Sequence, residues 1–381
     1  MQEAKKMKFT INKAKAYNAL GIVSRAISPN SPTPALAGIK IDADDNKVVF
    51  TGSDSTMSIQ ITLSGEDERL NIAVQDPGTI VADAKYLLEI FKKFETDTVT
   101  VELLDGTLTH FCDGKSQFKL NGYRPSDYPK ISFENLDISF MVKYEDLVDM
   151  IGKVAFACAF KETRPVLTGV NFISDGEKIV CAATDSFRLA QIVLPIKADK
   201  FNVTVPAKAL NELKNVFKPG DAITVSVSNR EMMFCSENKI MKTTLLNGAY
   251  PEVQKLIPID FKYHMTADRR VLLSGIDRAS FLKQDGISIV RFEIKPGQDV
   301  ILSSRSLEIG DFTERISAVV EGEDGMKVSF IGSYLADALK ALESDKVRIS
   351  FNEPVKPFIL ANEGSEEKDL IELVLPIRTF N

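Results

Sequence analysis

The sequence predicts an α+β protein built from three copies of one domain, each with two helices and antiparallel sheets. One pattern occurs three times in the 381 residues: a short polar start, an amphipathic helix, an Asp-led turn and an alternating strand. The turn aspartates Asp97, Asp221 and Asp345 are each 124 residues apart. Solenoid repeats run roughly 20–50 residues, whereas about 100–150 residues is typical of a whole domain. The period therefore indicates three domains.

Each copy follows the same order, from a strand to a helix, several strands, a second helix and several strands. Met7 begins the first strand, and residues 1–6 are interpreted as a short extension. Apolar residues alternate in the strands that follow the second helices, as in Val99 and Val101, which indicates one buried face. The six helices are expected at residues 12–27, 83–94, 144–161, 206–218, 266–283 and 333–343. Hairpin turns are expected at Asp105-Gly106, Asp113-Gly114, Asp175-Gly176 and Asn247-Gly248.

A second repeated feature supports the domain boundaries. The pair Gly38 and Asp54 recurs as Gly169 and Asp185, and both separations are 131 residues. The first two copies also end alike, at Asn121-Gly122-Tyr123 and at Asn247-Gly248-Ala249-Tyr250-Pro251. We therefore place the three domains at residues 1–134, 135–260 and 261–381, with the first half of the third copy the most diverged.

Composition narrows the class of protein. The chain is 44% hydrophobic and 26% charged, which is ordinary for a globular protein. No apolar run approaches the ~20 residues that span a bilayer, and no apolar segment follows the charged start, so a secretory signal is not expected. The four cysteines are far apart and form no Cys-x-x-Cys pair, so neither a zinc site nor a disulfide framework is expected. A cytoplasmic protein with free thiols is the simpler interpretation.

The sequence offers almost no catalytic chemistry. His110 lies in a strand, His264 begins the third copy, and neither has a recognisable nucleophile beside it. There is no phosphate-binding glycine motif, and acidic groups such as Glu321-Gly322-Glu323-Asp324 lie in loops that solvate them. We expect no enzyme, no cofactor and no metal. A hydrolase that uses His110 or His264 is kept as an alternative.

The net charge of −6 conceals an asymmetry. The six expected helices carry 16 Lys and Arg against 10 Asp and Glu, so the remainder of the chain carries −12. Lys and Arg also occur on solvated helix faces, but that would not favour them over Glu. If the helices line one surface, it would attract a polyanion such as duplex DNA without reading bases. The candidate residues are Lys13, Lys15, Arg25, Lys85, Lys92, Lys93, Lys153, Lys208, Lys214, Arg269, Arg270 and Arg278.

Several motifs, in this order and spacing, carry a resemblance to a known family. They are Met7-Lys8-Phe9-Thr10, Thr51-Gly52-Ser53-Asp54, Arg164-Pro165-Val166-Leu167-Thr168-Gly169, Ala183-Thr184-Asp185-Ser186-Phe187-Arg188-Leu189, Asn247-Gly248-Ala249-Tyr250-Pro251 and Leu375-Pro376-Ile377-Arg378. From Met7 onward the chain resembles the bacterial sliding clamp, the beta subunit of DNA polymerase III. The resemblance implies three clamp domains per chain and a ring of two chains joined head to tail.

The ring implied by this resemblance encircles double-stranded DNA without sequence preference and acts as a processivity factor. A clamp loader places it on DNA, and it tethers the DNA polymerase III alpha subunit and other clamp-motif replication and repair proteins. The resemblance also implies a homodimer interface formed by Phe118 and Leu120 from one chain and Phe281 and Leu282 from the other. Ordinary core packing is the alternative for these four residues.

Partners of this family insert a short hydrophobic peptide between the second and third domains. The matching positions are Leu167, Thr184, Arg188, Leu189, Pro251, Leu256, Val355, Pro357, Leu373, Val374, Leu375, Pro376, Ile377 and Arg378. An exposed apolar groove with Arg188 and Arg378 at its rim fits such a role. From the residues alone, 373–375 would be a buried strand. A peptide-binding scaffold that does not enclose DNA remains the alternative function.

Overall fold

The computed structural model describes residues 7–28, 31–161, 163–283, 285–364 and 369–378. These residues form two compact units. Unit 1 contains Met1–Glu145 and Glu212–Leu245, and unit 2 contains Asp146–Asn211 and Leu246–Asn381. The units cut across the middle third of the chain, because its strands complete sheets in both of them. The fold is α+β with antiparallel sheets, as predicted.

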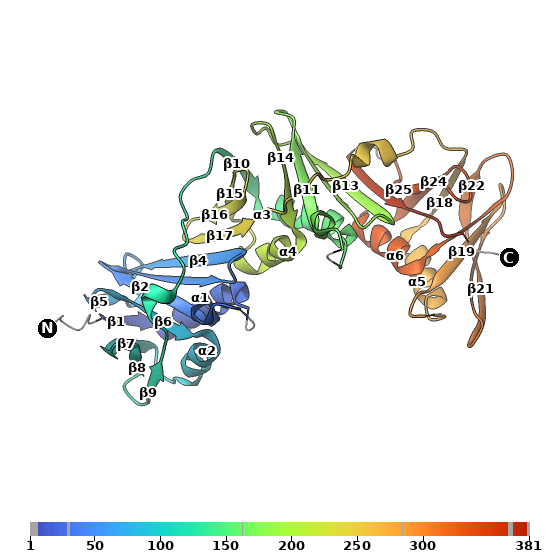
Figure 1. Ribbon diagram of the computed structural model, residues 1–381. Coiled ribbons are helices and arrows are strands. Elements are labelled where there is room, and N and C mark those ends of the chain that lie inside the picture. Colours follow the sequence, from blue (N-terminus) through green and yellow to red (C-terminus); the bar gives the residue numbers. More distant parts are fainter. Residues whose placement is uncertain (1–6, 29–30, 162, 284, 365–368, 379–381) are drawn as a thin grey trace. The chain divides into compact units, whose positions relative to one another are not determined.

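Two α-helices lie in each third of the described chain (Figure 1). Each is shorter than the sequence predicted. They are α1 (Lys13–Val23), α2 (Ala84–Lys93), α3 (Tyr144–Val154), α4 (Ala207–Val216), α5 (Arg269–Ala279) and α6 (Gly332–Ala341).

The helix ends differ from the prediction for local reasons. Asn12, Asp83 and Asp268 cap α1, α2 and α5, because each side chain accepts a backbone N–H of the first helical turn. These residues have extended backbone or lie outside the helical region, so the expected helices began too early. The expected helix at 144–161 was too long, because α3 ends at Val154 and a 3₁₀ turn, η5 (Ala155–Ala157), follows.

The three turn aspartates occupy equivalent places in the structure. In each copy the backbone carbonyl of this aspartate accepts a hydrogen bond from the first residue of the first helix. The pairs are Lys13 N to Asp97 O (2.8 Å), Tyr144 N to Asp221 O (3.1 Å) and Arg269 N to Asp345 O (2.8 Å). The 124-residue period of the sequence is therefore a structural repeat.

Unit 1 contains two antiparallel sheets. The first has the order β5 (Ala73–Asp76), β1 (Met7–Asn12), β7 (Thr98–Asp105), β8 (Leu108–Cys112) and β9 (Gln117–Asn121). The second has the order β10 (Ile138–Lys143), β15 (Ala222–Val227), β16 (Glu231–Ser236), β17 (Lys239–Thr244), β4 (Met57–Ser64), β3 (Lys47–Ser53), β2 (Gly38–Asp44) and β6 (Gly78–Asp83). The pairing of β17 with β4 joins strands from two copies into one continuous sheet.

Unit 2 repeats this arrangement. Its larger sheet has the order β14 (Phe201–Pro206), β11 (Gly169–Ser174), β12 (Ile179–Thr184), β13 (Arg188–Leu194), β26 (Leu370–Val374), β25 (Phe358–Asn362), β24 (Lys346–Phe351), β18 (Tyr263–Asp268) and β22 (Ala318–Glu321). Its smaller sheet has the order β21 (Gly310–Ile316), β20 (Val300–Ser306), β19 (Ile289–Ile294) and β23 (Met326–Ile331). Here β13 and β26 join two copies, as β4 and β17 do in unit 1.

Three of the four expected hairpins are confirmed. Asp105-Gly106, Asp113-Gly114 and Asp175-Gly176 each connect two paired strands, and each glycine has a positive φ. The hairpin expected at Asn247-Gly248 is wrong. The chain leaves β17 there and continues into a 3₁₀ turn, η7 (Val253–Leu256), and Gly248 uses its φ of 117° for this change of direction.

The hydrophobic cores lie between helices and sheets. In unit 2 the helices α5 and α6 pack together and cover one face of the third copy's sheets, with Leu272, Ile276, Leu335 and Leu339 fully buried. In unit 1 α1 and α2 pack together in the same way. Each helix thus uses one face for the core and leaves its polar face exposed.

Candidate functional site

The strands β13, β26 and β25 build an apolar surface in unit 2. Leu189 lies opposite Leu373, and Leu373 lies opposite Ile359. Side chains at such directly paired positions point to the same face of a sheet. Together with Ile371 these residues form a buried cluster, which we call the apolar floor.

Exposed apolar side chains belong to the segments next to the apolar floor. Leu256 is 55% exposed, Val355 is 51% exposed and Leu375 is 37% exposed. Leu375 is held by its backbone N–H, which donates to Phe187 O at 2.9 Å. Large apolar side chains gathered at a surface are typical of a site that receives another chain.

A tight turn positions one end of this surface. Thr184 Oγ1 donates to Arg188 O at 2.6 Å and accepts from Ser186 N at 3.1 Å. Asp185 Oδ1 accepts the N–H groups of Phe187 and Arg188. Ser186 has a φ of 79°, which the surrounding hydrogen bonds hold.

Arg188 was expected at the rim of the groove, but the structure places it elsewhere. Its guanidinium is only 13% exposed and donates to Asp185 Oδ2 at 3.0 Å and to Asp337 Oδ2 of α6 at 2.7 Å. It also lies over the rings of Tyr334 and Phe156, at 4.6 and 5.3 Å. The side chain therefore joins β13 to helix α6 instead of facing the apolar floor.

Val374 is also directed away from the apolar floor. It is fully buried in the core beneath α5 and α6, because alternate residues of a strand face opposite sides. The other expected pocket residues differ in exposure. Leu167, Thr184, Leu189 and Leu373 are buried, Pro251, Pro357, Pro376 and Ile377 are half-buried, and Arg378 is exposed.

Sequence reasoning missed two residues of this region. Tyr250 Oη accepts the N–H of Thr184 at 3.0 Å, and burial raises the pKa of the Tyr250 phenol. Glu372 lies between Ile371 and Leu373 but is 1% exposed, and its Oε1 has no hydrogen-bond partner among the described residues. Burial raises the pKa of the Glu372 carboxyl well above its usual range, and Arg188 opposes this rise. An acidic residue in the middle of an apolar strand was the available signal.

The twelve basic candidates differ in accessibility. Lys13, Lys153 and Arg269 are half-buried, and the other nine are exposed. Lys153 binds Asp149 and Glu343, both at 2.7 Å, and Arg278 forms a two-point ion pair with Glu314. Within their observed bounds the six helices carry 12 Lys and Arg against 7 Asp and Glu, so the excess of positive charge persists.

The strands β9 and β21 are among the edge strands of the four sheets, so among the described residues each has one side without a strand partner in its own sheet. β9 ends the five-stranded sheet of unit 1, and β21 ends the four-stranded sheet of unit 2. Phe118 and Leu120 of β9 are half-buried. Phe281 is 76% exposed, whereas Leu282 is 7% exposed and lies inside its own unit.

The histidines have structural partners. His110 Nε2 is 3.2 Å from Gln117 Oε1, and His264 Nδ1 is 2.9 Å from Ser350 Oγ. Arg348 Nε donates to the same nitrogen of His264 at 3.2 Å. Ser350 is only 1% exposed, so its hydroxyl beside His264 is buried and not open to a substrate. In the described residues no group of His, Cys, Asp and Glu has the arrangement of a metal site, and no described helix has the length and apolar character to cross a membrane.

Comparisons with known proteins cover nearly the whole chain. Models of the DNA polymerase III beta subunit match residues 7–132 (N-terminal domain), 141–252 (central domain) and 254–378 (C-terminal domain). The beta sliding clamp of Bacillus subtilis strain 168 is 35% identical over 381 residues, which is 98% of this chain and all of that protein.

Solved structures agree with these matches. The crystal structure of the Bacillus subtilis DNA polymerase sliding clamp has a TM-score of 0.93 at 35% identity. The DNA polymerase III beta chain of Streptococcus pneumoniae has a TM-score of 0.93 at 33% identity. In both comparisons 98% of this chain and all of the other chain are covered. With its three repeated domains, this chain belongs to the family of bacterial sliding clamps, the beta subunits of DNA polymerase III.

Proposed function

We propose that two copies of this chain form a head-to-tail ring around duplex DNA and tether polymerases through the surface above the apolar floor. Sliding clamps are processivity factors and not catalysts, and this chain has that function as a member of the family. The homodimer, the residues that face DNA and the peptide pocket are the parts proposed here. The domain boundaries at residues 134 and 260 are proposed with them.

The edge strands are the observation that carries the ring. Within the chain, β17 pairs with β4, and β26 pairs with β13. Strand β9 corresponds to β17 and β26, because each is the last strand of its copy. Strand β21 corresponds to β4 and β13, because each is the third strand after the first helix of its copy. A pairing of β9 from one chain with β21 from another would therefore reproduce a junction that each chain already makes twice. Such a heterologous contact closes only when the rotation per chain suits, and two chains would supply it.

The basic helices support the DNA-binding role. Their polar faces carry the excess of positive charge in a chain whose net charge is −6. DNA presents one negative charge per ~1.7 Å of axis, so a positive lining holds it without base contacts. The exposed lysine candidates of helices α1, α2 and α4 are Lys15, Lys85, Lys92, Lys93, Lys208 and Lys214. Arg25, Arg270 and Arg278 form ion pairs with Glu212, Asp345 and Glu314, which reduces the charge that they offer to DNA.

The apolar floor supports the partner role. Leu189, Leu373 and Ile359 form the apolar floor, and the neighbouring segments of the chain carry the exposed side chains of Leu256, Val355 and Leu375. Such a set of apolar groups suits a short peptide with aliphatic anchors. We propose the alpha subunit of DNA polymerase III, the clamp loader and other clamp-motif replication and repair proteins as the owners of such peptides. Their work on chromosomal DNA would place the protein in the cytoplasm.

Retention on circular and linear DNA tests the ring. After loading, the protein should stay on closed circular DNA and leave linear DNA through its ends, while light scattering should give the mass of two chains. Equal retention on both templates would contradict enclosure and would favour a peptide-binding scaffold that does not encircle DNA. A variant Phe118→Asp should give a monomer that circular DNA no longer retains.

A further inference from the structure

Unit 1 contains a second strand pair that corresponds to the apolar floor of unit 2. Ser58 pairs with Lys242 in unit 1, and Leu189 pairs with Leu373 in unit 2. Each member lies 131 residues before its counterpart. The internal repeat therefore builds the framework of the peptide pocket twice in each chain.

The turn next to each strand pair is also duplicated. In unit 1, Ser53 Oγ donates to Met57 O and accepts from Ser55 N, as Thr184 Oγ1 does with Arg188 O and Ser186 N in unit 2. The φ angles of Ser55 and Ser186 are 78° and 79°. The two sites share one backbone design, so the side chains on it decide what each site binds.

The side chains at the two sites have opposite character. In unit 2 the central pair is Leu189 and Leu373, which are both 2% exposed and apolar. In unit 1 the same positions hold a hydroxyl, Ser58, and an ammonium group, Lys242. A peptide with aliphatic anchors would gain little from this pair and would have to desolvate the charge.

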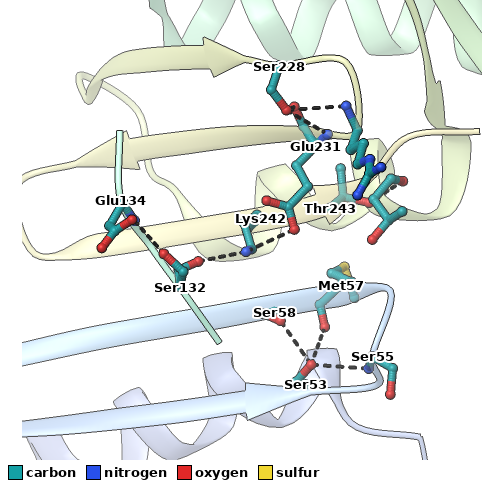
Figure 2. A network of polar contacts seen from close by, with 12 residues as sticks. Ser53, Ser55, Met57, Ser58, Ser132, Glu134, Ser228, Glu231, Lys242 and Thr243 are labelled. Atoms are coloured by element: carbon teal, nitrogen blue, oxygen red, sulfur yellow. Dashed lines mark hydrogen bonds and ion pairs between the residues drawn. The ribbon is translucent and has the colours of Figure 1, made fainter. Parts of the chain in front are cut away.

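Lys242 holds the chain's own linker, residues 129–134, over this strand pair. Its Nζ donates to Ser132 O at 2.6 Å and binds Glu231 Oε1 at 3.0 Å (Figure 2). The ammonium also lies 5.7 Å from the ring centroid of Phe133. The Lys242 side chain is only 11% exposed, so these contacts are largely shielded from water.

The linker is fixed at its other end as well. Ile131 packs against a small core of Ala35, Leu36, Val81 and Tyr128. Tyr128 Oη donates to Thr51 O at 3.3 Å, and the linker lines a hollow of about 730 Å³ together with Lys40 and Gln60, beside the strand pair and not on it. In unit 2 the corresponding segment packs Val253 against the apolar floor but leaves the apolar side chain of Leu256 55% exposed.

We propose that Lys242 is a specificity-determining residue, which closes the unit 1 site with the linker so that partner peptides find one address in each chain. This inference rests on the proposed peptide pocket of unit 2. It explains why the chain has two copies of the strand-and-turn framework but only one peptide-binding surface. The pair Ser58 and Lys242 would be sufficient to set the difference, since the backbone is shared.

Hydrogen exchange tests the hold of Lys242 on the linker. Lys242→Met keeps the aliphatic stem and removes the charge, and the linker amides of residues 130–134 should exchange about tenfold faster than in the unaltered protein. Lys239→Met is the matched control, because Lys239 lies on the same strand and binds Asp221 at 3.6 Å instead of the linker. Unchanged exchange in Lys242→Met, or an equal effect of both variants, would overturn the proposal.

Peptide stoichiometry tests the specificity. A fluorescein-labelled hexapeptide rich in Leu should bind once per chain in the unaltered protein and twice in Ser58→Leu/Lys242→Leu. A count of one in that variant, when its linker exchanges faster, would overturn the proposal. Leu373→Asp separates the two claims. As a single substitution it should abolish peptide binding, and binding that persisted would contradict the unit 2 pocket. The role of Lys242 would still be tested by the hydrogen-exchange rates of the linker.

Discussion

Arg188 and Glu372 place two ionisable groups inside the strand pair that carries the apolar floor. Met57 and Met241 hold the corresponding positions in unit 1, where both are buried. The fold therefore accepts apolar side chains here, and the charges are an added feature of unit 2. Arg188 is compensated by Asp185 and Asp337, but Glu372 Oε1 has no such partner among the described residues. Buried charges of this kind cost stability unless they are paired.

Glu372→Gln should raise stability at neutral pH. Burial raises the pKa of this carboxyl in the folded state, so the stability of the native protein is fully present below the unfolded pKa and falls as the pH rises through the folded pKa. Glutamine stays neutral and avoids that loss. Thermal unfolding should show a higher Tm for the variant at pH 8, by roughly 2–4 °C for each kcal/mol of added stability, and a shrinking difference toward pH 4. A constant difference across this range would contradict the explanation.

Arg188→Met should destabilise unit 2, because it leaves Asp337 and Asp185 without their shared cation. A loss of about 1–3 kcal/mol is expected for hydrogen bonds to charged groups that are partly shielded from water. Adding Glu372→Met, which recreates the Met57 and Met241 pair, should recover part of that loss. Denaturant unfolding of the single and double variants measures it, and strictly additive effects would show that the two residues do not interact.

The sequence could predict the site residues only in part. The family resemblance predicted Leu189 and Leu373 as pocket residues, and both lie in strands. The direction of Arg188 was not predictable, since it depends on Asp337, which is 149 residues away in the chain. Val374 was assigned to the pocket by the family resemblance, but the pleat of the strand turns its side chain into the core beneath α5 and α6.

At the scale of the element, local chemistry determines where helices begin. Asn12, Asp83 and Asp268 could have been chosen as caps from the sequence, and doing so would have corrected three helix starts. The start of α5 depends on strand pairing as well as on its cap, because residues 266–268 extend β18 against β24. Periodicity found every helix, whereas its ends needed caps and strand partners.

Two glycines around α1 should respond to alanine in opposite directions. Gly21 lies within α1 and has no atom within 4 Å of an added Cβ, so Gly21→Ala should stabilise the protein by about 1 kcal/mol through helix propensity. Gly52 of β3 faces the end of the same helix, and an added Cβ would lie 2.2 Å from Val23 O.

Gly52→Ala should therefore cost about 1–3 kcal/mol, because backbone must move to admit the methyl group. Urea midpoints at equal m-value measure both changes, and Gly21→Ala serves as the control for side-chain size. If Gly52→Ala had the same free energy of unfolding as the unaltered protein, α1 would be able to shift away from β3 at little cost.

At the scale of the whole molecule, the repeat determines how the three copies join. Two junctions are made within the chain by β17 with β4 and by β26 with β13, and the proposed ring would use the edge strands β9 and β21 for a third. The structure of the repeat was visible in the sequence as periods of 124 and 131 residues. The joining of copies into shared sheets was not, because strand partners from different copies leave no local pattern.

Charge reversal on the helices should weaken the hold on DNA without weakening the helices. Lys85 and Lys208 are each the second residue of a helix, α2 and α4, and both are exposed. Glutamate is favoured in the first turn of a helix, so Lys85→Glu and Lys208→Glu should leave helix stability intact or improve it. Retention on circular DNA should fall, and log affinity should depend less steeply on log salt, by about 0.9 for each phosphate that the protein no longer neutralises.

Lys47→Glu with Lys178→Glu is the matched control, since both lysines are exposed and lie outside the helices. The control pair changes the net charge by the same amount but should change the salt slope much less. An equal decrease from both pairs would mean that total charge governs binding and that the helices do not face DNA. A decrease confined to Lys85 and Lys208, which belong to different copies, would mean that the repeated helices present one basic surface to the duplex.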